Sequence, residues 1–120
     1  MCIFVVEDDF LIRTILVEEL VDAGFDVREA GTGDEAVAML ANLDPPPRVL
    51  VTDVHMPGQH DGIRLAAHVR RRLPDIPVIY TTGRPDALAH LGRLGEGQVL
   101  VRKPYTPAEI ISRIQQLLAA

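Results

Sequence analysis

Short runs that are apolar on both faces recur along the chain and alternate with segments of helical periodicity. The clearest runs cover residues 2–6, 49–51, 78–80 and 99–101, and a weaker, half-polar run covers residues 26–29. A strand with two apolar faces must be covered by helices on both sides, which is typical of a parallel sheet. The half-polar run suits an edge strand of that sheet.

Helical patterns fill the spaces between these runs, and we expect helices at residues 10–23, 32–43, 61–73 and 106–118. Thr32 and Glu35 have the spacing of a capping box, as do Thr106 and Glu109, and Pro107 is typical of a first helical position. In the first helix the expected core stripe is Ile12, Ile15, Leu16 and Leu20, and in the last it is Ile110, Ile111, Ile114, Leu117 and Leu118. Glycines surround the fourth intervening segment, so only a short helix is expected there, at residues 85–91.

Five strand–helix units in 120 residues predict one α/β domain covering residues 1–120. Five parallel strands with right-handed crossovers form a doubly wound sheet. Ligands bind such sheets outside the carboxyl ends of the strands. We therefore expect the functional residues directly after each apolar run.

Composition narrows the class of function. A net charge of −5 argues against a nucleic-acid-binding surface, and Arg70-Arg71-Arg72 is interpreted as a solvated helix end. Cys2 is the only cysteine, which excludes an internal disulfide and favours a reducing compartment. The sequence contains no signal-peptide pattern and no run long enough to span a bilayer, so a cytoplasmic protein is expected.

The residues at the expected strand ends have complementary charges. Glu7, Asp8 and Asp9 follow the first run, Asp53 the third, Thr81-Thr82 the fourth and Lys103-Pro104 the fifth. Carboxylates that converge repel one another unless a cation lies among them, and a set of oxygen ligands favours Mg²⁺. A carboxylate nucleophile, a divalent metal, an ammonium group and a hydroxyl meet the needs of phosphoryl transfer.

Taken singly, each of these residues has a structural explanation. Asp and Glu suit the first turn of a helix, and a lone Asp after a strand is commonly a turn former or an N-cap. Thr82 alone is an ordinary strand residue, and Lys103 alone an ordinary surface lysine. Their arrival together at the functional ends of four strands favours a site.

At this point the chain resembles the receiver domains of two-component response regulators over its whole length. The segments that carry the resemblance are Val5-Val6-Glu7-Asp8-Asp9, Val51 to Gly58 (VTDVHMPG), Asp61-Gly62, Tyr80-Thr81-Thr82-Gly83 and Lys103-Pro104-Tyr105. The resemblance implies a flavodoxin-like fold with strand order 2-1-3-4-5. It also implies a phosphoaccepting domain of a phosphorelay rather than an enzyme.

The resemblance assigns a role to each matching residue. Asp53 would accept the phosphoryl group, while Thr82 and Lys103 would bind it. The Mg²⁺ ligands would be Asp8, Glu7 through water, Asp53 and the backbone carbonyl of His55. The Lys103-Pro104 peptide bond would be cis. His60 and His68 match no motif and are expected to face solvent, and Asp9 is expected to cap the first helix.

One departure from the family pattern concerns Leu100, which stands where many receivers have a Tyr or Phe that moves with the switch threonine. The run Thr81-Thr82-Gly83-Arg84 is similar to receivers common in alphaproteobacteria, both stand-alone ones and those attached to hybrid kinases. With Met1 only a few residues before Glu7, an excised domain is one expectation and a stand-alone receiver the other.

The implied partners are a sensor histidine kinase or a histidine phosphotransfer protein, a downstream protein, and a second copy through the fourth and fifth elements. His55 and Arg84 would tune hydrolysis of the acyl phosphate.

Three alternatives stay open at this point. An aspartyl-phosphate phosphatase would usually carry a second Asp at position 55, where this chain has His55. An FMN carrier would need a hydroxyl- and glycine-rich phosphate loop after the first strand, and a pseudo-receiver would only bind a partner.

Overall fold

The computed structural model describes residues 1–84, 86, 92 and 94–120. Strands and helices alternate as the sequence predicts over residues 2–82 and again over residues 98–119. The elements are β1 (Cys2–Val6), α1 (Phe10–Asp22), β2 (Asp26–Ala30), α2 (Gly33–Leu40), β3 (Val49–Asp53), α3 (Gly62–Arg72), β4 (Val78–Thr82), β5 (Gln98–Arg102) and α5 (Pro107–Ala119). The short helix expected at residues 85–91 lies outside the described residues, apart from Asp86.

The five strands form one parallel sheet in the order β2-β1-β3-β4-β5. The predicted doubly wound fold and its strand order are therefore confirmed, and the half-polar β2 lies at an edge as expected. Strands β3 and β4 end about two residues later than their apolar runs, so Asp53 and Thr82 are the last residues of their strands rather than the first residues of loops. This places both side chains at the carboxyl edge of the sheet.

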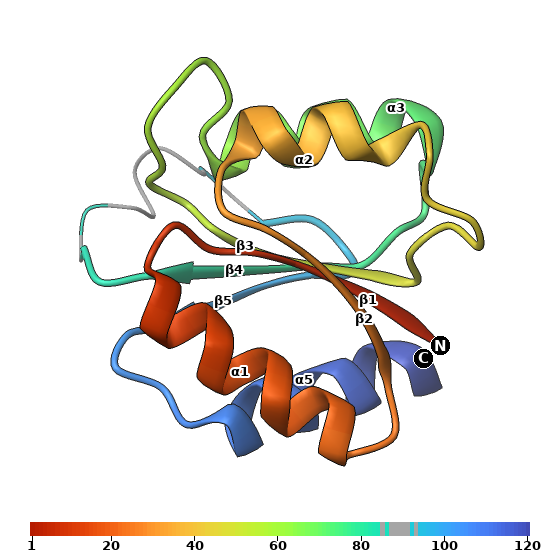
Figure 1. Ribbon diagram of the computed structural model, residues 1–120, viewed down its shortest axis with the longest axis vertical. Coiled ribbons are helices and arrows are strands. Elements are labelled where there is room, and N and C mark those ends of the chain that lie inside the picture. The colour runs from red at the N-terminus through yellow and green to blue at the C-terminus, as the bar shows by residue number, and fades with distance from the viewer. Residues whose placement is uncertain (85, 87–91, 93) are drawn as a thin grey trace.

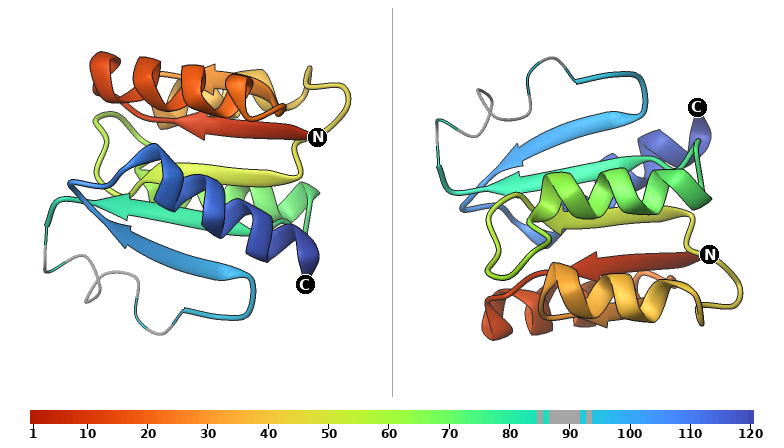
Figure 2. Two further views of the ribbon diagram at one scale, coloured as in Figure 1. Left: turned by 90° about the horizontal axis from the view of Figure 1, so that it is seen from below. Right: turned by 90° about the horizontal axis from the view of Figure 1, so that it is seen from above.

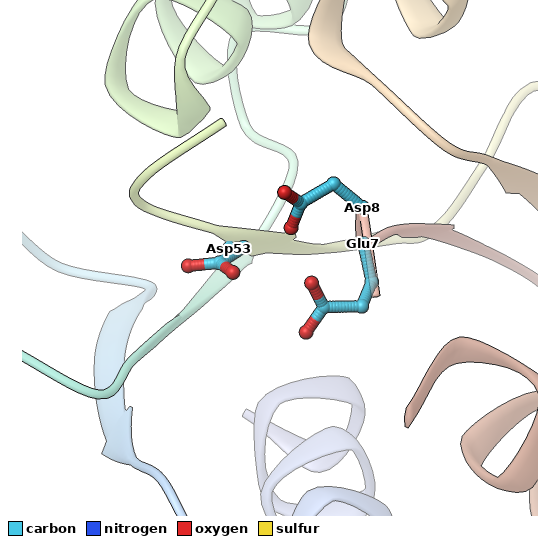
Figure 3. A group of neighbouring side chains, drawn as sticks. All are labelled: Glu7, Asp8 and Asp53. Carbon is cyan, nitrogen blue, oxygen red and sulfur yellow. The ribbon is translucent and has the colours of Figure 1, made fainter. Parts of the chain in front are cut away.

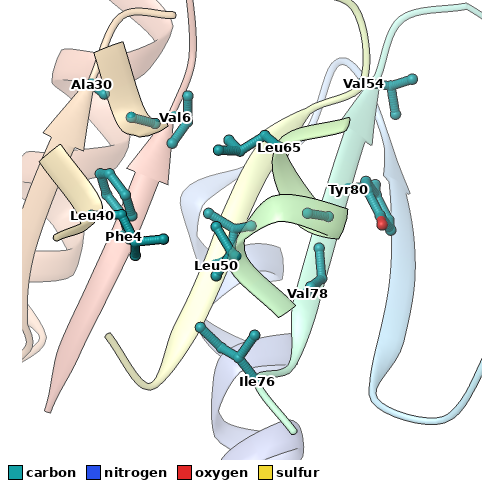
Figure 4. Close-up of a cluster of buried hydrophobic side chains, with 13 residues drawn as sticks. Phe4, Val6, Ala30, Leu40, Leu50, Val54, Leu65, Ile76, Val78 and Tyr80 are labelled. Carbon is teal, nitrogen blue, oxygen red and sulfur yellow. The ribbon is translucent and has the colours of Figure 1, made fainter. Parts of the chain in front are cut away.

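Helices cover both faces of the sheet, α2 and α3 on one and α1 and α5 on the other (Figures 1 and 2). Each face has its own aliphatic core. Phe4, Leu50, Leu65 and Val78 lie in the core beneath α2 and α3 (Figure 4). The core beneath α1 and α5 includes Leu16, Leu20, Ile110 and Ile114, all almost fully buried. Covering on both faces explains why β1, β3 and β4 are buried throughout their lengths.

The helix caps follow the sequence closely. The Asp9 carboxylate accepts a hydrogen bond from the Ile12 amide, and Thr106 and Glu109 form a complete capping box. At α2 only half of the expected box forms, because the Glu35 carboxylate accepts from the Gly31 amide, one residue before the cap. Caps are readable from sequence because they depend on neighbours within about one turn.

Two predictions about helix ends and faces are wrong. Helix α2 ends at Leu40 rather than Leu43, since the Asn42 and Leu43 amides form tighter turns back to Met39 and Leu40 ahead of the three prolines. Ile15 of the predicted α1 stripe is 46% exposed, because α1 packs mainly through Leu16 and Leu20. In α5 the predicted stripe is confirmed at Ile110 and Ile114, which are buried, and in part at Ile111, Leu117 and Leu118, which pack against the core but are only partly buried.

The arginine cluster at the end of α3 is only partly solvated. Arg71 and Arg72 are exposed as expected. Arg70 is half-buried, and its Nη2 donates to the carbonyl of Ile76 at 2.8 Å, which ties the end of α3 to the approach to β4. In the described part of the chain, no helix combines the length and the apolar character that crossing a membrane requires.

Candidate metal centre

Three carboxylates meet at the carboxyl edge of the sheet. Glu7 and Asp8 follow β1, and Asp53 ends the neighbouring strand β3 (Figure 3). One ligand oxygen from each lies within 4.8 Å of the others, an arrangement that can hold a metal ion. Glu7 and Asp53 are buried, whereas Asp8 is exposed. The acidic residues of two distant segments are thus brought together as the sequence predicts.

Lys103 bridges two of these carboxylates from the loop after β5. Its Nζ donates to Glu7 Oε1 at 2.6 Å and to Asp53 Oδ2 at 2.8 Å. The peptide bond from Lys103 to Pro104 is cis, as expected. The backbone amide of Lys103 also donates to the Thr82 carbonyl at 2.7 Å, so its main chain stays close to the end of β4.

These contacts shift the ionisation of the buried groups. Burial raises the pKa of Glu7 to about 7, against the opposing hydrogen bond from Lys103 and with help from the charge on Asp53. Burial acts to lower the pKa of Lys103, but its bonds to Asp53 and Glu7 outweigh burial and raise that pKa above the usual value. Lys103 is therefore a fixed positive charge.

Charge is not balanced within the four residues. The three carboxylates and one ammonium have a formal charge of −3 + 1 = −2 when all are ionised. A divalent cation would remove this excess, and oxygen-only donors suit a hard ion. Glu7, Asp8 and Asp53 therefore fit a metal site by position, burial and charge.

Backbone amides hold the second carboxylate oxygen of Glu7 and of Asp53. The His55 amide donates to Asp53 Oδ1 at 3.2 Å, and the Asp9 amide donates to Glu7 Oε2 at 3.2 Å. Because Lys103 holds Oδ2, both oxygens of Asp53 have a donor. The orientation of this carboxylate is therefore set by β3, the loop after it and β5.

Thr82 lies at the same edge but is engaged elsewhere. Its hydroxyl oxygen accepts from the Arg84 amide at 3.0 Å and lies 3.3 Å from the Arg84 carbonyl. The side chain is 2% exposed. The structure thus brings Glu7, Asp8, Asp53 and Lys103 into contact, with His55 beside them, while the Thr82 hydroxyl bonds to the chain after β4.

An open pocket of about 400 Å³ adjoins the acidic cluster. Its walls are residues of three loops: Asp8, His55, Met56, Pro57, Asp61 and Arg84. A second hollow of about 320 Å³ continues towards Ile63 and Arg64 at the start of α3. The loop after β3 forms one wall of this pocket through His55, Met56 and Pro57.

Sequence reasoning missed two sets of contacts. Arg13 of α1 donates to the Glu7 carbonyl at 2.7 Å and pairs with Glu29 at 3.1 Å. His60 and His68, expected to face solvent, are both partly buried, and His60 Nδ1 lies 2.7 Å from Asp34 Oδ1. No local pattern in the sequence signals either pair, because the partners are far apart along the chain.

Comparison with known families decides what kind of domain this is. The model of the response regulator receiver domain matches residues 3–115, nearly the whole chain. The chain is a receiver domain of the response regulator family. The predicted family is therefore confirmed. Receiver domains are the phosphoryl-accepting signalling modules of two-component systems, and the acidic pocket of this receiver fits that function.

Among curated relatives, the receiver is 35% identical over 120 residues to the transcriptional regulatory protein AruR of Pseudomonas aeruginosa, covering 97% of this chain and 48% of AruR. It is 31% identical over 118 residues to the DNA-binding transcriptional regulator NtrC of Salmonella typhimurium, covering 98% of this chain and 24% of NtrC. The receiver thus spans about half of the length of AruR and about a quarter of the length of NtrC.

Solved structures agree in fold. A response regulator receiver protein from Sinorhizobium medicae superposes with a TM-score of 0.88 at 27% identity, covering 100% of this chain and 95% of that one. The receiver domain of the hybrid histidine kinase CckA gives a TM-score of 0.83 at 28% identity, with 98% and 99% covered. A response regulator receiver protein and a hybrid-kinase receiver domain are therefore both similar to this chain.

Proposed function

We propose that Asp53 accepts a phosphoryl group from a phosphohistidine and that this receiver, residues 1–120, thereby switches a protein–protein contact. The observation that carries the proposal is the position of Lys103 Nζ, 2.8 Å from Asp53 Oδ2, beside two further carboxylates. A nucleophilic carboxylate next to a fixed positive charge suits phosphoryl transfer, which depends on positioning and on neutralising the charge of the phosphoryl oxygens.

We propose Mg²⁺ as the cofactor, held by Asp8, Asp53 and the backbone carbonyl of His55, with Glu7 acting through water. The excess charge of −2 and the all-oxygen donor set support this choice. When bound, Mg²⁺ would neutralise phosphoryl oxygens and orient the donor at the open side of the pocket. The exposed position of Asp8 leaves that side accessible.

The receiver's own residues prepare the attack. Hydrogen bonds from the His55 amide and Lys103 fix the plane of the Asp53 carboxylate, which reduces the orientational cost of reaction. A carboxylate oxygen of Asp53 forms the new bond to phosphorus, the bond from phosphorus to the donor histidine breaks, and the donor imidazole keeps that electron pair. Lys103 then binds the phosphoryl group. The domain thus catalyses its own phosphorylation and, more slowly, its dephosphorylation, with His55 and Arg84 at the pocket wall tuning the latter.

Switching would begin at Thr82. Its hydroxyl bonds the Arg84 backbone in this structure, and a phosphoryl group on Asp53 offers it a stronger, charged acceptor. Movement of Thr82 would change the segment after β4 and the face formed with β5 and α5. We propose this face as the contact for a downstream protein or a second copy. Leu100, which packs against the α2–α3 core, supplies no aromatic ring for the change.

A protein donor suits the surface near the site. Phe10 and Leu11, at the start of α1 directly after the acidic loop, are 71% and 66% exposed. Such an apolar rim fits a sensor histidine kinase or a histidine phosphotransfer protein. The net charge of −5 argues against nucleic acid as a partner of this domain, and the single cysteine is compatible with a cytoplasmic location.

The test is phosphorylation by acetyl phosphate in MgCl₂, followed by intact-protein mass spectrometry. Wild type and the control Asp75→Asn, which changes an exposed carboxylate away from the pocket, should gain the mass of one phosphoryl group. Asp53→Asn should gain none. Equal phosphorylation of Asp53→Asn and wild type would reject Asp53 as the acceptor.

A further inference from the structure

We propose that Asp34 and His60 form a positioning pair that holds the loop after β3 against α2 and thereby sets the geometry of the Mg²⁺ pocket. The inference rests on the proposed function, because it concerns the same pocket. It assigns a role to two residues that lie outside the pocket and that no motif in the sequence identifies.

The first support is the number of donors on one carboxylate. Asp34 Oδ1 accepts from the His60 amide at 2.9 Å and lies 2.7 Å from His60 Nδ1, while Oδ2 accepts from the Gln59 amide at 3.1 Å. The hydrogen bond from His60 lowers the pKa of Asp34, so the carboxylate is ionised near neutrality. Asp34 is 47% exposed, and solvent weakens the charge interaction itself. The three aligned donors, rather than charge alone, therefore define the contact.

Close backbone approach provides the second support. A Cβ at Gly58, where φ is +94°, would overlap Asp34 Oδ2, and a Cβ at Gly33 would overlap the His60 carbonyl oxygen. The loop and the first turn of α2 thus meet without room for a side chain at either position. A chance contact between two surface side chains would leave room for a Cβ at both positions, whereas this contact depends on glycine at each.

The loop has further contacts on its α3 side. The His60 ring makes an edge-to-face contact with His68, with 6.0 Å between centroids, and Arg64 Nη1 donates to the Gln59 carbonyl at 3.2 Å. Arg71 and Arg72 also lie within electrostatic range of His68. His60 therefore lies between the Asp34 carboxylate of α2 and the His68 ring of α3.

The pair is important for the pocket because the hydrogen bonds described for residues 55–60 involve side chains rather than backbone pairing. Its ends are fixed where the Val54 amide donates to Thr81 and the Gly62 amide donates to Val54. Among the described residues, no backbone-to-backbone hydrogen bond outside the regular elements involves residues 55–60. Met56 and Pro57, which form part of the pocket wall with His55, lie in this span. Asp34 therefore anchors the Gln59–His60 end of this stretch, and the His55 amide on Asp53 anchors the other end.

The Asp34–His60 contact and Mg²⁺ binding must influence each other equally, and this makes the positioning role testable. If the Asp34–His60 contact favours the pocket geometry that binds Mg²⁺, Mg²⁺ must favour the Asp34–His60 contact by the same factor. A contact that only stabilises the fold would not respond to the metal. The Gln59 and His60 amides, which donate to Asp34, report on the contact directly through their rate of hydrogen exchange.

The experiment measures binding of MgCl₂ by calorimetry and amide exchange by NMR in wild type, Asp34→Asn, His60→Gln and the control Glu35→Gln. Glu35 is the next residue of α2 and caps only the Gly31 amide. We expect Asp34→Asn and His60→Gln to bind Mg²⁺ about threefold or more weakly, and Glu35→Gln to bind as wild type does. Mg²⁺ should also slow exchange of the Gln59 and His60 amides in wild type.

Unchanged Mg²⁺ affinity in a folded Asp34→Asn or His60→Gln protein, with wild type binding the metal, would overturn the positioning role alone. Exchange at Gln59 and His60 that does not respond to bound Mg²⁺ would overturn it as well. Failure of wild type to bind Mg²⁺ would reject the proposed metal site and the positioning role together. Circular dichroism identifies an unfolded variant, and the other variant then decides.

Discussion

Lys103 Nζ lies 2.8 Å from Asp53 Oδ2 and 2.6 Å from Glu7 Oε1, so one ammonium joins the loop after β5 to the ends of β3 and β1. The two contacts span 50 and 96 residues of sequence. Without a metal, this ammonium is the only positive group among the described residues to which either carboxylate forms an ion pair. The contact links the stability of the site to its chemistry.

Replacing Lys103 with Met should abolish most phosphorylation while the fold is kept. Methionine keeps most of the apolar stem of the side chain but removes the charge that stabilises phosphoryl oxygens. Loss of one such group typically costs about a hundredfold in rate. Initial rates with acetyl phosphate, measured by intact mass, test this. Arg102→Met, at an exposed neighbouring position, is the matched control and should react as wild type does. A Lys103→Met rate close to wild type would show that Lys103 is dispensable.

Glu7 should make the metal-free protein lose stability as pH rises. Its pKa is about 7 in the folded state against 4.5 as the ordinary value, so the native state binds more protons between these two pH values. The free energy of unfolding therefore falls across this window, by on the order of 1–3 kcal/mol. Urea titrations in EDTA at about pH 5 and about pH 8 measure the fall. Glu7→Gln should reduce it, whereas Glu18→Gln, an exposed α1 variant, should not. If the free energy of unfolding fell as much in Glu7→Gln as in wild type, groups other than Glu7 would cause the pH dependence.

Gly62 should not tolerate alanine. A Cβ at this position would overlap the backbone carbonyl of Asp53, which the sheet holds in place. Gly62→Ala should lower the free energy of unfolding by about 2 kcal/mol or more, since overpacking displaces backbone. Gly95→Ala is the control, because its Cβ would meet nothing closer than Gln98 Oε1 at 3.9 Å. Urea unfolding compares the two. Similar stability for both variants would mean that β3 and α3 separate easily.

Most of the fold was predictable because the evidence for it is local. The apolar runs located the strands, and Asp9, Thr32 and Thr106 located three helix starts within a turn. The predictions that went wrong depended on packing. Ile15 has the spacing of a core residue, but α1 rests on the sheet through a narrower stripe than periodicity implies.

The site was predictable in part. The carboxyl ends of neighbouring parallel strands lie at the same edge of a sheet, which brings Glu7, Asp8 and Asp53 together. The strand pattern of this one sequence was therefore enough to predict the acidic cluster. Roles for Thr82 and Lys103 came from the family resemblance. The Asp34–His60 pair was not predictable, because its partners are 26 residues apart and both have ordinary surface identities. Only the folded loop after β3 brings them together.

The central claim is that phosphorylation occurs on the Asp53 side chain, and residue-level mapping tests it most directly. The receiver would be phosphorylated with acetyl phosphate and MgCl₂, then reduced with borohydride, which converts an aspartyl phosphate to homoserine, and digested for peptide mass spectrometry. The account predicts homoserine at position 53 and at no other aspartate. Homoserine at Asp8 or Asp9 with Asp53 unchanged, or no conversion in a protein that binds Mg²⁺, would contradict it.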